Sequence, residues 1–301
     1  MSELESELQN PPVYFRYGDA KIFATLVSSL AEIVEEAALR VTKDGVTAKG
    51  MDPAKVAYIE VSIPYTNFLE YDVREELTIG VNLASLERAL SRAKKGYTLS
   101  LKADQSRVLV VVEGNVTRTY SLPNIEVASE GVDIKLEHTA RARVLSDPFK
   151  RAITDAGQFS DVIELEATES YLAVRGVGER RAESKFLSGT ASLVELDVKE
   201  PARARYDVSY LEKVLDLTKV AENIDVQFKT DSPLELNFES PGGFTVRYVL
   251  APSAVGAGAA PPPAEEKGRK EREAEAEEEE EAEEEEAGEE EGEEGESEEE
   301  E

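Results

Sequence analysis

The chain has 301 residues with 64 acidic and 34 basic side chains, one histidine and no cysteine, which gives a formal net charge of -30. The lack of cysteine excludes disulfides, thiolate metal sites, iron–sulfur clusters and cysteine nucleophiles. Because His138 is the single histidine, a metal site with two histidines is excluded within one chain, and we expect neither a metal nor a cofactor.

The first predicted elements are a strand and then an amphipathic helix. Ile22, Leu26 and Leu30 recur every four residues, so they form one apolar stripe along a helix. After this stripe apolar and polar residues alternate, which is the pattern of half-buried strands. Asp44-Gly45 interrupts the alternation and predicts the turn of a hairpin.

A second helix is predicted at residues 85–95. Ser85 is a suitable N-cap, because its hydroxyl can accept a bond from a free amide of the first turn. The core face of this helix holds Leu86, Ala89, Leu90 and Ala93. Alternating apolar residues from Leu99 to Leu122 then predict a set of antiparallel strands.

The same order of elements runs again from about residue 137. Residues 83–90 align with residues 208–215 at an offset of 125, and the offset drifts by only a few residues elsewhere. This internal duplication predicts an α+β protein made of two similar tandem domains, residues 13–122 and 137–255. An acidic head, residues 1–12, precedes them.

A connector, residues 123–136, joins the two predicted domains. It scatters Ile125, Val127 and Leu136 among acidic residues, whereas a purely flexible linker would lack such aliphatic side chains. One interpretation is that these residues continue a strand. The other is a connector that lies across the surface with partly exposed apolar groups, and the pattern leaves both open.

The last segment, residues 256–301, holds 24 Glu against 4 Lys or Arg. It cannot bury enough apolar surface to fold and its charges repel one another, so we expect a disordered tail. The tail is either a solvating brush or an electrostatic competitor that occupies basic surface on its own assembly or on partners.

Positive charges gather on the predicted helices of an otherwise acidic body. Arg88, Arg92 and Lys95 follow spacings of four and three, opposite the apolar face of the second helix. A solvated helix face explains one such helix, but repetition in four helices favours a surface that faces a polyanion. Without aromatic or amide partners these cations would neutralise phosphates and would not read bases. The candidates are Lys21, Arg88, Arg92, Lys94, Lys95, Lys150, Arg151, Lys213 and Lys219.

Enzyme motifs are missing from the chain. Gly176-Val177-Gly178 has no third glycine and no helix after it, so it does not predict a dinucleotide loop. We therefore expect no catalytic residue and no enzymatic activity. No apolar run reaches the length of about 18 residues that a membrane helix needs, so we expect a soluble intracellular protein without a membrane partner.

Three segments carry a family resemblance over residues 13–253. They are Asp44-Gly45-Val46 leading into Gly50-Met51-Asp52-Pro53-Ala54-Lys55-Val56, then Gly80-Val81-Asn82-Leu83, and last Tyr248-Val249-Leu250-Ala251-Pro252. Together they resemble sliding clamps of the proliferating cell nuclear antigen (PCNA) type, most closely archaeal ones. The resemblance implies a pseudo-sixfold ring of three subunits, with helices around a central hole for duplex DNA and antiparallel sheets outside.

The resemblance also implies two kinds of contact site. An apolar pocket for partner peptides with a short helical, aromatic-ended motif would use Met51, Val56, Tyr58, Ile125, Val127, Leu136, Pro233, Leu250, Ala251 and Pro252. Ring closure would pair an edge strand at residues 116–121 with one at residues 180–187 of the next subunit. Its interface residues would be Thr117, Tyr120, Arg181 and Lys185.

The function implied is that of a processivity factor in DNA replication and repair. Its partners would be double-stranded DNA without sequence preference, two further clamp subunits, and DNA polymerase, clamp loader, flap endonuclease and DNA ligase through a peptide motif. We expect it in the cytoplasm, associated with the nucleoid. The alternative is an acidic chaperone-like or DNA-mimic protein that acts through its glutamate tail.

Overall fold

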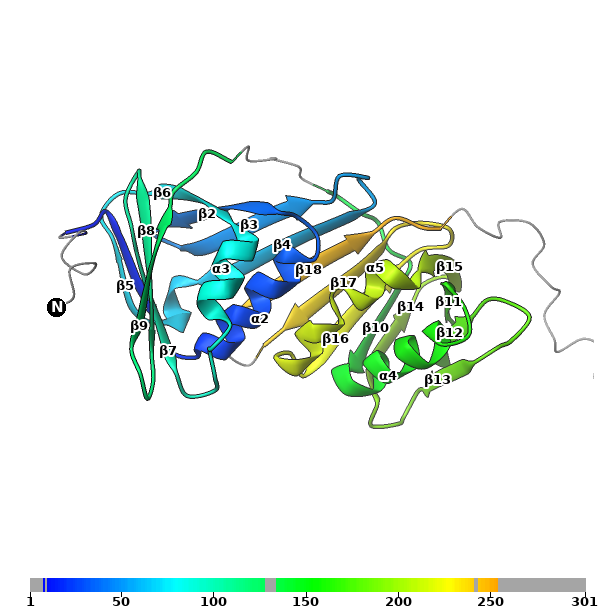
Figure 1. Cartoon of the computed structure of the whole chain (residues 1–301). Coiled ribbons are helices and arrows are strands. Elements are labelled where there is room, and N and C mark those ends of the chain that lie inside the picture. Colours follow the sequence, from blue (N-terminus) through cyan, green and yellow to red (C-terminus); the bar gives the residue numbers. More distant parts are fainter. Residues whose placement is uncertain (1–7, 9, 128–133, 241–242, 254–301) are drawn as a thin grey trace, which may run out of the picture. The chain divides into compact units, whose positions relative to one another are not determined.

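A computed structural model describes residues 8, 10–127, 134–240 and 243–253 (Figure 1). The first half contains β1 (Val13–Tyr17), α2 (Ala20–Ala31), β2 (Glu36–Thr42), β3 (Gly45–Met51), β4 (Ala57–Pro64), η1 (Tyr65–Asn67), β5 (Phe68–Val73), β6 (Leu77–Asn82), α3 (Leu83–Leu90), β7 (Thr98–Ala103), β8 (Arg107–Glu113) and β9 (Arg118–Pro123).

The second half repeats this order. It contains β10 (Ala140–Leu145), α4 (Ser146–Gly157), β11 (Val162–Ala167), β12 (Tyr171–Gly176), β13 (Glu183–Leu187), β14 (Leu193–Val198), β15 (Ala202–Asp207), α5 (Val208–Glu212), η2 (Leu215–Lys219), β16 (Asn223–Phe228), β17 (Leu234–Glu239) and β18 (Thr245–Leu250). The predicted α+β class and the internal duplication are confirmed.

The strands form three sheets with antiparallel neighbours. A five-stranded sheet has the order β5-β1-β7-β8-β9, and a four-stranded sheet has the order β13-β12-β11-β15. Between them a nine-stranded sheet, β14-β10-β16-β17-β18-β4-β3-β2-β6, draws strands from both halves. The halves meet where β18 pairs with β4, with Arg247 opposite Glu60. The helices lie over one face of this shared sheet (Figure 1).

The first helix forms where the apolar spacing predicts it. Asp19 caps α2, because its Oδ1 accepts bonds from the backbone amides of Lys21 at 2.9 Å and Ile22 at 3.2 Å. Phe23, Leu26, Val27 and Leu30 are buried in the core, whereas Ile22 is only half-buried. The stripe therefore holds α2 against the sheets.

The second helix begins and ends earlier than predicted. Its N-cap is Asn82, whose Oδ1 accepts from the backbone amide of Ser85 at 3.0 Å, so Ser85 lies inside α3 and is not the cap. The Ser91 hydroxyl donates to the Arg88 carbonyl oxygen at 2.8 Å and competes for the acceptor that the next helical turn needs. Because α3 ends at Leu90, Arg92, Lys94 and Lys95 lie on the following loop and not on a helix.

The equivalent helix of the second half is broken in two. The short α5 is followed by the 3-10 helix η2, with Lys213 at the junction and Lys219 at the end. Leu211, Val214 and Leu217 are buried at a spacing of three. That spacing matches a 3-10 helix, in which residues i and i+3 eclipse, better than an α-helix. The expectation of four similar cationic helices is wrong for this one.

The turn of the first hairpin is shifted by one residue from its predicted place. Thr42 pairs with Gly45, so the turn residues are Lys43 and Asp44. Gly45 begins β3 with a φ of +148°, and a Cβ there would lie 2.2 Å from the carbonyl oxygen of Ile63 on the neighbouring strand. Glycine is needed because β4 passes so close.

The described parts of the connector lie on the surface and do not continue a strand. Residues 124–127 and 134–138 have no strand structure. Ile125 donates its backbone amide to the Gly80 carbonyl oxygen at 3.0 Å, which covers part of the exposed edge of β6. A methyl group built on Gly80 would lie 1.9 Å from the Ile125 carbonyl oxygen, so only glycine allows this approach. The strand interpretation is wrong for these residues.

Some predictions concern residues outside the described ranges. They cover most of the acidic head, connector residues 128–133 and the glutamate tail. Of the head, Leu8 is buried against Leu109 and Val111 on the five-stranded sheet. No helix in the described ranges is long and apolar enough to cross a membrane.

Candidate functional sites

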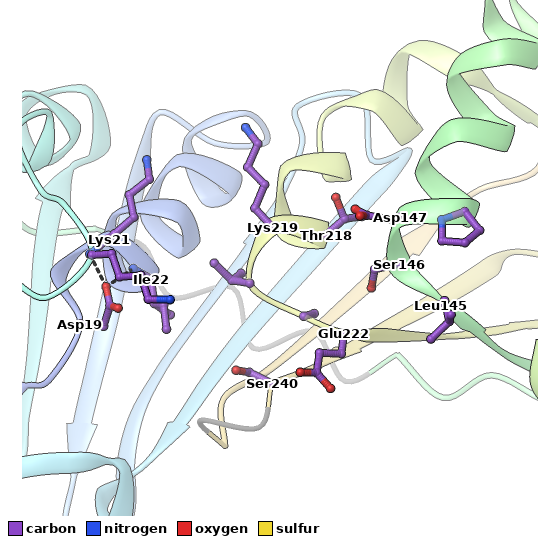
Figure 2. A pocket seen from close by; sticks show the side chains of 14 residues that line it. Asp19, Lys21, Ile22, Leu145, Ser146, Asp147, Thr218, Lys219, Glu222 and Ser240 are labelled. Atoms are coloured by element: carbon purple, nitrogen blue, oxygen red, sulfur yellow. Dashed lines mark hydrogen bonds between the residues drawn. The ribbon is translucent and has the colours of Figure 1, made fainter. Parts of the chain in front are cut away.

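Predicted cations of both halves converge between helices. Lys21 of α2, Arg88 of α3 and Lys219 of η2 line one cavity of about 490 Å³. Lys21 and Lys219 also line a second cavity of about 780 Å³, together with Lys95 and the first residues of α4. Figure 2 shows both lysine side chains extending away from the strands beneath them. The structure therefore brings cations from distant segments to one surface, here called the helix surface.

Acidic groups neutralise part of the helix surface in the second half. Asp216 Oδ1 accepts from Lys219 Nζ at 2.8 Å and from Lys150 Nζ at 3.5 Å. The hydrogen bond from Lys219 is the main cause that lowers the pKa of Asp216. Lys213 Nζ lies 4.8 Å from the centroid of the Tyr210 ring, a cation–π distance.

The remaining candidate cations are solvent-exposed. They are Lys21, Arg88, Arg92, Lys94, Lys95 and Arg151, and none forms an ion pair with another residue in the described part of the chain. Of the cations that line the two cavities, Lys21, Arg88 and Lys95 are therefore not neutralised by the described residues. Exposed, unpaired cations suit contacts with phosphates that form and break quickly.

Apolar side chains form a row across the other face of the nine-stranded sheet, here called the outer face. Tyr58 of β4 lies opposite Met51 of β3 and opposite Val249 of β18. Tyr58 and Val249 are 3% and 6% exposed, although they do not belong to the main core cluster. Met51 is half-buried, so this row forms an apolar patch on the outer face whose accessible part lies at Met51, whereas Tyr58 and Val249 are covered.

The end of the described chain borders this patch. Ala251 donates its backbone amide to the Val56 carbonyl oxygen at 2.9 Å, which continues the pairing of β18 with β4. Val56, Ala251 and Pro252 are half-buried. Most of the first-half and C-terminal residues predicted for the pocket are thus brought together.

A buried carboxylate shapes the loop that carries Val56. Asp52 Oδ1 accepts from the backbone amides of Val56 at 2.7 Å and Ala57 at 2.6 Å. Its Oδ2 accepts from the Tyr210 hydroxyl of α5 at 3.3 Å. Asp52 is therefore a structural residue that fixes this side of the patch.

One predicted pocket residue faces the other side of the sheet. Leu250 is fully buried between Ala57 and Leu234, so its side chain faces the core and not the outer face. The residue in that place is Val249, which the sequence reasoning missed. The alternation of Val246, Tyr248 and Leu250 with outward Arg247 and Val249 is the signal that identifies it.

The connector residues that were predicted for the pocket lie at the two opposite ends of the connector. Ile125 and Val127 lie beside Gly80 of β6, and three strands, β2, β3 and β4, separate β6 from β18. Leu136 lies two residues after Ile134, whose carbonyl oxygen accepts from Arg247 Nη2 of β18 at 2.7 Å. Pro233 precedes β17, where Leu234 pairs with Leu250. Ile125 and Val127 are thus not placed beside the apolar patch.

A charged cluster lies next to the apolar patch. Glu235 of β17, which is opposite Val249, accepts from Arg247 Nη2 at 2.8 Å and from Asn237 Nδ2 at 3.0 Å. His138 Nε2 lies 3.4 Å from the same carboxylate. Burial alone raises the pKa of Glu235, but hydrogen bonds from His138, Arg247 and Asn237 lower it to about 2. The carboxylate is therefore ionised at neutral pH and holds Arg247 in place.

Several strands end a sheet beside exposed apolar groups, and β9 and β13 are two of them. β9 ends the five-stranded sheet and β13 ends the four-stranded sheet. Leu187 at the end of β13 is 49% exposed, and Val116 just before β9 is 55% exposed. Such edges are normally covered in a soluble assembly. The backbone and these side chains together suit pairing with another strand.

The predicted interface residues lie at or near these edges. β9 begins at Arg118 and β13 at Glu183, so Thr117 and Arg181 precede the strands and do not lie within them as predicted. Tyr120 is half-buried on β9. Lys185 is exposed on β13, with its Nζ 5.0 Å from the centroid of the Tyr171 ring.

No metal-binding cluster was found among the residues that the structure describes.

Comparisons with known proteins find similarity over most of the chain. A family described as "Proliferating cell nuclear antigen, N-terminal domain" matches residues 13–136. DNA polymerase sliding clamp 1 of Aeropyrum pernix is 42% identical over 246 residues, which cover 79% of this chain and 99% of that protein. The DNA polymerase sliding clamp of Thermofilum pendens is 33% identical and covers 80% of this chain and 98% of its own length.

Solved structures show the same fold. The crystal structure of PCNA from Thermococcus kodakaraensis superimposes with a TM-score of 0.75 at 26% identity, and covers 80% of this chain and 100% of that chain. The PCNA2–PCNA3 complex from Sulfolobus tokodaii contains a chain with a TM-score of 0.74 at 24% identity, which covers 79% of this chain and 98% of its own.

Proposed function

The chain belongs to the PCNA family of DNA polymerase sliding clamps, and from this premise we propose that three copies of it close into a ring around duplex DNA. Its function is that of a clamp that keeps DNA polymerase on DNA. The mechanism is mechanical and needs no catalytic residue. Escape from DNA requires an interface to open, so tight phosphate contacts are unnecessary.

The open edges of β9 and β13 are the observation that carries this proposal. They are different strands on different sheets, so pairing β9 of one copy with β13 of the next is a head-to-tail contact that can close a ring. Three copies of a duplicated chain supply six similar domains, which gives the ring its pseudo-sixfold symmetry. Ring closure also removes both open edges from solvent.

In this ring the helix surface faces the DNA. Its exposed cations neutralise phosphates without reading bases, so binding is independent of sequence and sensitive to salt. The ion pairs of Asp216 with Lys150 and Lys219 reduce the net charge of the lining. A weakly cationic lining leaves the ring free to slide.

Charge reversal of Arg88 and Arg92 tests the DNA-facing assignment. We expect the Arg88→Glu, Arg92→Glu double variant to retain less DNA, by about tenfold, because two phosphate contacts become repulsive. The salt dependence of retention should also become shallower, by about 0.9 in log–log slope per lost contact. Loading on circular DNA at several salt concentrations measures both.

The matched control carries the same change in charge elsewhere. Lys43→Glu with Lys199→Glu reverses two exposed cations outside the helices. Both double variants should remain trimers in sedimentation experiments. Equal DNA retention by the two double variants would remove Arg88 and Arg92 from the DNA-facing surface.

The apolar patch on the outer face is the docking site for partner peptides. The half-buried Met51, Val56, Ala251 and Pro252 offer apolar surface to aromatic side chains, and the buried Tyr58 and Val249 support them. DNA polymerase, the clamp loader, flap endonuclease and DNA ligase bind there in turn through a short motif. The protein works in the cytoplasm, at the nucleoid.

Removal of the glutamate tail distinguishes a clamp from an acidic chaperone-like protein. We expect the chain without residues 256–301 to stimulate a DNA polymerase as the full chain does. The physical reason is that the edges, the helix surface and the patch all lie before the tail. The Aeropyrum pernix relative matches over 79% of this chain, and that match already covers 99% of its own length. Loss of polymerase stimulation on truncation would favour the chaperone-like alternative.

A further inference from the structure

The connector is fixed to the nine-stranded sheet at its N-terminal end by the Asn124 side chain. Asn124 Oδ1 accepts from the Gly80 backbone amide at 2.8 Å, and its Nδ2 donates to the Asp104 carbonyl oxygen at 2.8 Å. The next residue, Ile125, donates its own amide to the Gly80 carbonyl oxygen. The amide side chain accepts from β6 and donates to the turn between β7 and β8, so Asn124 is held in one orientation.

The C-terminal end of the connector is fixed by Arg247. Its Nη2 donates to the Ile134 carbonyl oxygen at 2.7 Å and to Glu235 Oε2 at 2.8 Å. His138, four residues after Ile134, reaches the same carboxylate. The Arg247 side chain is only 25% exposed and that of Glu235 only 12%, so these charge-assisted bonds are shielded from water.

This second anchor lies next to the apolar patch. Arg247 and Val249 project from β18 onto the outer face, one pleat apart, and Glu235 lies opposite Val249 on β17. Any displacement of Ile134 therefore moves the connector relative to Tyr58 and Val249. Ile134 is thus held beside the strand that carries Val249.

We infer that Arg247 is a positioning residue for partner binding: it holds residues 134–138 beside the strand that carries Val249, and so pre-organises this side of the peptide site. The inference rests on the proposed function of the apolar patch. Binding is stronger when the receptor is already ordered, because less conformational entropy is lost when the partner docks. The Arg247 side chain itself need not touch the partner.

A second ion pair on the same face separates positioning from general stability. Arg143 Nε and Nη2 donate to Asp225 at 2.6 and 2.9 Å, and Asp225 is buried. Arg143 thus resembles Arg247 in chemistry, burial and sheet, but no contact between it and the described connector residues is found. Arg143→Gln therefore removes a comparable ion pair without releasing the connector.

The test measures binding of a synthetic peptide with one helical turn ending in two aromatic residues to the full chain by calorimetry. We expect Arg247→Gln to weaken binding about tenfold, equivalent to about 1.4 kcal/mol. Arg247→Lys should fall between it and the wild type, because an ammonium group replaces only part of the guanidinium geometry. Arg143→Gln should bind within about twofold of the wild type.

Hydrogen exchange adds a readout that stability alone does not change. Backbone amides of residues 134–139 should exchange faster in Arg247→Gln and not in Arg143→Gln. Equal weakening by Arg247→Gln and Arg143→Gln, or unchanged binding by Arg247→Gln, would overturn the inference. If Arg247→Gln does not fold, Arg247→Lys carries the same comparison, and its loss of affinity must still exceed that of Arg143→Gln. No binding by the wild-type chain would instead overturn the proposed peptide site, and this inference with it.

Discussion

A Leu187→Asp chain is expected to remain monomeric and to lose processive DNA synthesis. Leu187 is 49% exposed at the end of β13, so the isolated chain tolerates a carboxylate there. In the ring the same carboxylate would be buried against β9 of the next copy, at a cost of about 2 kcal/mol or more at each interface. Because every interface of the ring incurs this cost, closure fails. Sedimentation velocity and a primer-extension assay on circular DNA measure the two effects.

Val194→Asp is the matched control for this experiment. Val194 is 55% exposed on β14, which is also a sheet edge, but no ring contact is assigned to it. That variant should form rings and support polymerase as the wild type does. A trimeric Leu187→Asp chain would show that the subunits meet elsewhere.

A Met51→Asp chain should lose partner-peptide binding by more than about 100-fold, which corresponds to about 2.7 kcal/mol. Met51 is half-buried on the outer face, so the free protein can solvate the new carboxylate. A docked peptide would remove that water without supplying a hydrogen bond, and the cost of burying an unpaired charge is large. Calorimetry with the wild type and the variant measures the change.

Thr47→Asp controls for charge on the same strand and face. Thr47 lies on β3 four residues before Met51, opposite Ser62. Thr47 lies far enough along the strand from Met51 to be outside the apolar patch. Its substitution should therefore leave peptide affinity within about twofold of the wild type, as surface substitutions usually do. If Thr47→Asp and Met51→Asp reduced binding alike, the effect would be long-range electrostatics and the patch would not be the docking site.

Local sequence patterns predicted those helices and strands that are determined by residues close together in the sequence. The spacing of Leu26 and Leu30 identified α2, and alternation identified the strands that follow it. The length of α3 was missed because one hydroxyl, on Ser91, ends it early. The equivalent helix of the second half is broken at Lys213. This break was missed because an apolar spacing of three residues was not distinguished from one of four.

Features that depend on distant contacts could not be derived in this way. The connector remained ambiguous because its place is decided by Gly80, more than forty residues earlier in the chain. The family resemblance indicated which segments border the peptide site but not which way each side chain points. Leu250 was therefore assigned to the pocket in place of its neighbour Val249, and strand alternation corrects this.

The pairing of β18 with β4 makes the order of synthesis matter for this protein. Strand β4 (Ala57–Pro64) leaves the ribosome long before β18 (Thr245–Leu250), the strand that covers its edge. The edge of β4 in the first half therefore stays unpaired until residues 245–250 have been synthesised. Although the duplicated halves look like two modules, the nine-stranded sheet needs strands from both. Separating the halves would therefore expose an unpaired edge strand on each piece, β4 on one and β18 on the other.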